Sequence, residues 1–149
     1  MKCGTRLSGT HSILGTEKMK TEKLYRIAEE NNIKLDYFSL PDNKSVCVKM
    51  GDKQFIGIDG ELTLADERVC LAHELGHCQT EAFYNIYSPL DIRQKHENRA
   101  DKWAVACLIP KQELLSAIKK GHREPSELAE HFCVTEEFIK KAIAIHGLC

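Results

Sequence analysis

The stretch Leu71-Ala-His-Glu-Leu-Gly-His-Cys78 contains the pattern His-Glu-x-x-His in a segment without proline. Good helix formers precede it, so we expect this segment to be helical. Residues four apart lie on the same face of a helix, one turn from each other, so His73 and His77 can direct both imidazoles at one point. Paired imidazoles of this kind bind zinc. Glu74 then occupies the position of a general base beside the metal.

A catalytic zinc ion needs a third protein ligand and keeps one position for water. A glutamate from a later helix is one known solution, and Glu97 is placed to supply it. Asp101 follows Glu97 by one helical turn and can accept the N–H of a ligating imidazole. His96 or a cysteine is an alternative to Glu97. The predicted site consists of the metal ligands His73, His77 and Glu97, the catalytic residue Glu74, and Asp101.

A simpler interpretation exists for each half of this constellation. Two histidines one turn apart can merely pack or cap a helix, and Glu97 with Asp101 can be a solvated acidic face. The joint spacing of the two motifs argues against that interpretation. An oxyanion also needs a donor in zinc hydrolysis, and the sequence does not distinguish between four candidates. These are Tyr84, Tyr87, His96 and Arg99.

The central motifs also resemble a known family. The order and spacing of Leu71-Ala-His-Glu-Leu-Gly-His77, Glu97-Asn-Arg-Ala-Asp101 and Leu108-Ile-Pro110 are similar to those of the ImmA/IrrE zinc metallopeptidases. The resemblance spans about residues 24–145 and is most specific at the centre. It implies a cytoplasmic peptidase that cleaves a helix-turn-helix repressor in a mobile genetic element or a stress-response circuit, with ligands and base at the positions named above.

The composition is that of an ordinary globular domain. The chain has 149 residues, of which 42% are hydrophobic and 29% charged, enough for one core. A formal net charge of −1 gives no basic field for nucleic acid, so we do not expect direct nucleic-acid binding. No apolar run has the length of a membrane span, and the N-terminus lacks the apolar core of a signal peptide. We therefore expect a cytoplasmic protein without membrane contact.

The cysteines support the same compartment. There are seven, an odd number, and none has Cys-x-x-Cys spacing. This usage is typical of free thiols in a reducing environment and argues against a structural zinc site built from four cysteines. Cys70, about one turn before His73, is more simply a core thiol than a regulatory thiol or a ligand.

The first part of the chain predicts an arm, a helix and a small antiparallel β-sheet. Residues 1–18 are rich in glycine, serine and threonine and predict a flexible N-terminal arm. Helical spacing of apolar residues follows over residues 20–30. Residues 34–40 alternate like a short strand, and residues 45–50 and 54–59 predict a β-hairpin. The edge of such a sheet can take a peptide as an added strand, or the hairpin can simply close the core.

Helices are predicted for the rest, which makes the fold class α+β with a mainly helical body. Thr63 can N-cap a helix over residues 64–80, and a second helix over residues 94–108 ends before Pro110. The zinc site would lie between these two helices. Residues 19–149 are expected to form a single metallopeptidase domain.

The last part of that domain, residues 111–149, predicts a helical C-terminal tail with a helix-turn-helix-like pattern. Its last helix begins with Glu136 and Glu137, which are poor groups for reading base edges. We therefore expect the tail to pack on the core or to dock a protein substrate. The alternative function is a DNA-binding or repressor-binding regulator with a non-catalytic metal site.

Overall fold

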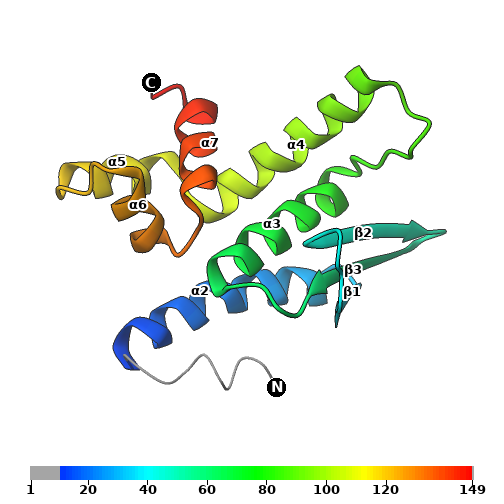
Figure 1. Ribbon diagram of the computed structural model, residues 1–149, viewed down its shortest axis with the longest axis horizontal. Helices are drawn as coiled ribbons and strands as arrows, with labels where there is room; N and C mark the ends of the chain where they lie inside the picture. Colours follow the sequence, from blue (N-terminus) through cyan, green and yellow to red (C-terminus); the bar gives the residue numbers. More distant parts are fainter. Residues whose placement is uncertain (1–10, 149) are drawn as a thin grey trace.

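The computed structural model describes residues 11–148, and their side chains from residue 21 onward. Over this range the chain forms a mainly helical α+β structure with one small sheet, which confirms the predicted fold class (Figure 1). The elements are, in order, α2 (His11–Glu30), β1 (Ile33–Phe38), β2 (Ser45–Met50), β3 (Lys53–Asp59), α3 (Leu64–Thr80), α4 (Leu90–Leu108), α5 (Lys111–Lys119), α6 (Pro125–Phe132) and α7 (Glu136–His146).

The three strands form a mixed sheet with the order β1-β3-β2. The predicted hairpin of β2 and β3 is confirmed, but β1 runs parallel to β3, so the expectation of a purely antiparallel sheet is corrected. The physical reason is burial. Strand β3 carries Ile56 and Ile58, which are almost fully buried, so it takes the centre of the sheet. After β1 the chain first forms β2 at the far edge and then returns to place β3 between the two.

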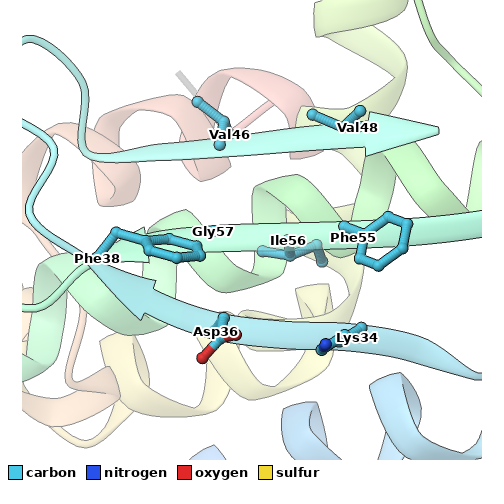
Figure 2. A pocket seen from close by; sticks show the side chains of 8 residues that line it. All are labelled: Lys34, Asp36, Phe38, Val46, Val48, Phe55, Ile56 and Gly57. Carbon is cyan, nitrogen blue, oxygen red and sulfur yellow. The ribbon is translucent and has the colours of Figure 1, made fainter. Parts of the chain in front are cut away.

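The two faces of the sheet have different surroundings. Helices lie behind one face, where Ile56 and Ile58 join the hydrophobic core. The other face carries Phe38, Val46 and Val48, all exposed, together with Phe55 (Figure 2). This alternation is the one that the period of two along a strand requires.

Helix α3 has the bounds that the sequence predicts. The Thr63 hydroxyl caps its first turn by accepting a hydrogen bond from the Asp66 backbone N–H at 3.2 Å, and Glu81 ends it in the left-handed conformation. It packs between the sheet and α4 (Figure 1). At Gly76 the two helices approach so closely that a Cβ would lie 2.5 Å from the Ala100 carbonyl oxygen. Glycine therefore permits the contact on which the spacing of α3 and α4 depends.

Two helices begin earlier than the sequence suggests. Helix α4 begins at Leu90 rather than near residue 94, directly after Pro89. Helix α2 begins at His11, so residues 11–18, predicted as part of a flexible arm, are helical. Residues 1–10 of that arm lie outside the described residues. None of the helices described is long and apolar enough to cross a membrane.

The tail helices α5, α6 and α7 cover one end of the α3–α4 pair (Figure 1). Helix α7 buries Phe138, Ile139 and Ala142. The buried guanidinium of Arg68, on α3, donates hydrogen bonds to the carbonyl oxygens of Phe132 and Cys133 in the turn between α6 and α7. The tail is thus attached to α3 by a buried polar contact as well as by apolar packing.

Candidate metal centre

The two histidines of α3 bring their Nε2 atoms close together. His73 and His77 lie one turn apart, their Nε2 atoms are 3.1 Å apart, and their rings meet edge to face at an interplanar angle of 84°. His77 is buried and His73 half-buried. The convergence expected from the four-residue spacing is therefore present in the structure.

The Nδ1 atom of each ring makes a hydrogen bond to an oxygen atom. His73 Nδ1 donates to Asp101 Oδ1 at 2.8 Å, and His77 Nδ1 donates to the Ala82 carbonyl oxygen at 2.6 Å. The left-handed end of α3 places that carbonyl, because the Ala82 N–H donates in turn to the His77 carbonyl. Anchoring Nδ1 in this way fixes the ring and leaves Nε2 for a metal ion.

Glu97 brings its carboxylate from α4 to the same point. Its Oε2 atom lies 2.9 Å from His73 Nε2, and its Oε1 atom lies 3.1 Å from His77 Nε2. The ligand atoms of these three residues lie within 4.8 Å of one another. Tetrahedral zinc with bonds of about 2.0–2.1 Å would separate its ligand atoms by about 3.3 Å, so a small adjustment admits the ion. The donor set of two imidazoles and one carboxylate suits zinc.

In the metal-free protein, protons take the place of the ion. Burial lowers the pKa of His73, but hydrogen bonds to Asp101 and Glu97 outweigh it and raise the pKa to about 9. The pKa of His77 is raised too, because its bonds to Glu97 and the Ala82 carbonyl outweigh burial. Hydrogen bonds from both histidines lower the pKa of Glu97 well below its usual range. The cluster therefore favours positive charge, which protons supply in the metal-free protein.

Asp101 connects this site to the tail. Its Oδ2 atom lies 2.9 Å from the Lys141 ammonium of α7, while Oδ1 accepts from His73. Burial raises the pKa of Asp101, but the bonds from His73 and Lys141 prevail and lower it. The carboxylate is therefore ionised and can orient a neutral imidazole.

Glu74 stands beside the three-residue cluster without joining it. It is 8% exposed, and the Ser45 hydroxyl of β2 donates to its Oε1 atom at 2.6 Å. It lines an open cleft of about 250 Å³ between β2 and the loop after α3. The other residues that line the cleft are Ser45, Val46, Cys47, His77, Ala82, Phe83, Tyr84 and Glu97.

Tyr84 is the aromatic residue that reaches the cluster. Its hydroxyl donates to Glu97 Oε1 at 2.7 Å, and this bond, with burial, raises the pKa of Tyr84 to about 12. His96 instead stacks on the Tyr84 ring, with centroids 6.4 Å apart. Tyr87 is 88% exposed. Among the proposed oxyanion donors, Tyr84 is the one whose hydroxyl lies at the cluster in the cleft.

The alternative ligands are not part of the cluster. Among the described residues, the histidine, cysteine, aspartate and glutamate side chains that converge in a group of three or more are His73, His77 and Glu97. His96 lies outside this group, and so does Cys70, whose pKa is raised by burial.

Sequence reasoning missed two side chains that support the site, Ser45 and Lys141. Each comes from an element far from the motifs in the chain, β2 for Ser45 and α7 for Lys141. A serine opening a strand and a lysine on a helix face are common residues in common positions. No local spacing could have indicated their partners.

A comparison with protein families finds a match over most of the chain. The family model Peptidase_M78, described as an IrrE N-terminal-like domain, matches residues 17–144. The matched range includes α3, α4 and all the residues of the cluster. No curated protein matches the chain.

Proposed function

Because the chain belongs to the IrrE N-terminal-like family of peptidases, we propose that it is a zinc-dependent endopeptidase. In this proposal the zinc ligands are His73, His77 and Glu97, and Glu74 is the catalytic base. The observation that carries it is the convergence of the three ligand atoms within 4.8 Å of one another, at the wall of an open cleft.

The donor set decides which chemistry is available. When bound by two imidazoles and a carboxylate, zinc lowers the pKa of water to about 7 and polarises a carbonyl group. Asp101 and the Ala82 carbonyl keep both imidazoles in the tautomer that such binding requires. These contacts support a catalytic centre because they orient the rings from one side and leave the cleft side open.

In this proposal Glu74 moves the proton during hydrolysis. The Ser45 hydroxyl holds its Oε1 atom and so fixes the rotation of the carboxylate at the cleft wall. From there Glu74 takes a proton from the attacking water and passes it to the leaving amine. The Tyr84 hydroxyl can donate to the developing oxyanion when it gives up its hydrogen bond to Glu97.

For the substrate we propose a helix-turn-helix repressor, on the resemblance of the central motifs to the ImmA/IrrE family. The cleft borders β2, an edge strand that can bind an extended peptide by main-chain hydrogen bonds. Free cysteines are typical of reducing compartments, which supports a cytoplasmic setting.

A comparison of new N-termini tests the proposed function. Zinc-loaded protein and its Glu74→Gln variant are incubated with a lysate of the source cells, and the N-termini that appear are identified by mass spectrometry. Both proteins should contain about one zinc per chain, because glutamine at this position leaves the ligands intact. Only the unsubstituted protein should create new N-termini, and these should be concentrated in helix-turn-helix proteins.

Two results would contradict parts of the proposal. Equal cleavage by both proteins would show that Glu74 is not the base. Zinc in both without any cleavage would favour the alternative, a regulator with a non-catalytic metal site.

A further inference from the structure

Two thiols meet at the wall of the cleft, outside the set of proposed ligands. Cys47 of β2 and Cys78 of α3 have their sulfur atoms 3.0 Å apart. Cys47 lines the cleft, whereas Cys78 is 4% exposed and directly follows His77. Both are free thiols in this structure. A disulfide has an S–S bond of about 2.05 Å, so an approach of about 1 Å would allow one to form.

The backbones that carry these thiols are held in register by other contacts. Cys47 pairs with Ile56 in the antiparallel ladder, and Ile56 is almost fully buried against the helices. Gln54, on the neighbouring strand, donates through Nε2 to the Cys78 carbonyl oxygen at 3.3 Å. The sulfur atoms are therefore brought together by packed elements rather than by a chance side-chain rotation.

We propose that Cys47 and Cys78 form an oxidisable dithiol, a modification site whose disulfide joins the edge strand β2 to the helix that carries the two histidines. The oxidant is a peroxide, with hydrogen peroxide as the simplest case. The Cys47 sulfur attacks the peroxide O–O bond and becomes a sulfenic acid while one water leaves. The Cys78 sulfur then displaces the sulfenic oxygen as a second water, so that two thiols and one peroxide give one disulfide and two waters.

The first attack is assigned to Cys47 because it lines the cleft and Cys78 does not. The hydrogen bond with Cys78 and burial both raise the pKa of the Cys47 thiol. Only the thiolate attacks, so the pair should oxidise more slowly than free cysteine and stay reduced at low peroxide. Thiol–disulfide exchange with a reduced dithiol reverses the bond.

The bond has two measurable consequences. It closes a loop that contains β3 and most of α3, so it restricts the unfolded chain and should raise the melting temperature by roughly 5–15 °C. It also ties the cleft wall next to Glu74 and His77. Neither consequence requires peptidase activity, so the test stands or falls independently of the proposed function.

The test maps disulfides in the full-length protein, both zinc-loaded and metal-free, after treatment with hydrogen peroxide. Alkylation and non-reducing digestion with trypsin and a glutamate-specific protease isolate Cys47 in peptide 45–49 and Cys78 in peptide 75–81, separate from Cys70. The expected product is the cross-link of these two peptides, lost on addition of dithiothreitol. Cys107 is a half-buried cysteine on α4, so Cys107→Ser is the matched control and should leave the cross-link unchanged.

Two variants sharpen the result. Cys47→Ser and Cys78→Ala should each abolish the cross-link and the rise in melting temperature. The proposal is overturned if the peptide 45–49 accumulates as sulfinic acid without the cross-link, or if other cysteines dominate the disulfides formed. Mapping of the unsubstituted protein decides this even if a variant folds poorly.

Discussion

The hydrogen bonds made by the Nδ1 atoms of the two imidazoles determine what the site can bind. His73 and His77 each commit Nδ1 to an oxygen, Asp101 Oδ1 for one and the Ala82 carbonyl for the other. Both Nε2 atoms then face Glu97, where only a cation satisfies all three groups. A proton does so in the metal-free protein, so proton and metal compete for the same atoms.

That competition predicts proton release when zinc binds. The pKa of His73 is raised to about 9 in the metal-free site, so this ring is protonated at pH 7.5 and must lose its proton to bind zinc. We expect at least one proton released per zinc at pH 7.5, from His73, with further release from the zinc-bound water, and an affinity that increases with pH up to about 9. Isothermal titration in buffers of different ionisation enthalpy measures the number. His77→Ala should bind no stoichiometric zinc, and a heat that does not depend on the buffer would contradict the prediction.

Residues near the motifs could be predicted from the sequence, and distant ones could not. The spacings within α3 and α4 follow from helix geometry, and the structure brings His73, His77 and Glu97 together as the motifs suggested. Ser45 and Lys141 come from a strand and a distant helix, and no spacing relative to the motifs fixes their direction. Their contacts depend on tertiary packing, which one sequence does not disclose.

At the scale of elements, the contact between α3 and α4 sets the distance from the histidines to Glu97. Gly76 lies at this contact, and a Cβ there would come within 3.1 Å of the Ala100 carbonyl carbon as well as within 2.5 Å of its oxygen. Backbone atoms of a helix cannot move aside singly. A side chain at position 76 must therefore push the two helices apart.

We therefore predict that Gly76→Ala weakens both the fold and the metal site. Overpacking of this kind costs about 1–3 kcal/mol, and zinc affinity should fall at least about tenfold because Glu97 moves away from the histidines. Thermal unfolding and competition with a zinc chelator measure the two effects. Gly57→Ala is the matched control, since its Cβ would meet side-chain carbons of Phe38 and Val46 on the open face of the sheet. Equal zinc affinity in both variants would contradict the prediction.

The bounds of elements were predictable where local signals mark them. Thr63 and the apolar pattern define α3, and α7 has a threonine N-cap, Thr135, and a glycine C-cap, Gly147, which are common local signals. The position of β1 beside β3 has no local signal, because it depends on which strand the core buries. The early start of α4 was missed because Leu90-Asp-Ile92 is largely exposed and lacks a clear apolar face.

At the scale of the whole molecule, the tail and the metal centre share supports. Lys141 of α7 holds Asp101, which in turn holds His73. The buried Arg68 of α3 donates to two carbonyl oxygens at the end of α6, those of Phe132 and Cys133. The sequence predicted helices in the tail but not where they dock. Both contacts favour the hypothesis that residues 19–149 unfold as one domain.

This hypothesis predicts that Arg68→Met destabilises the molecule through the tail. The substitution keeps much of the apolar stem but leaves the Phe132 and Cys133 carbonyls without their donor, at a cost of about 2–4 kcal/mol in the free energy of unfolding. The melting temperature should fall by roughly 5–15 °C. Arg123 is an exposed arginine near the start of α6, so Arg123→Met is the control and should change the melting temperature little.

The unfolding of the parent protein decides whether tail and core form one unit. If they do, zinc release, far-ultraviolet circular dichroism and the fluorescence of Trp103 on α4 should follow a single transition, because α3 cannot keep its packing once the tail has left Arg68. In Arg68→Met the part of the circular dichroism that comes from α5, α6 and α7 should be lost at a lower temperature than the one at which zinc is released. The opposite result is that the tail melts before the core in the parent protein as well, and that Arg68→Met does not change its melting temperature. The tail would then be an independent unit, and the buried guanidinium would not couple it to the metal centre.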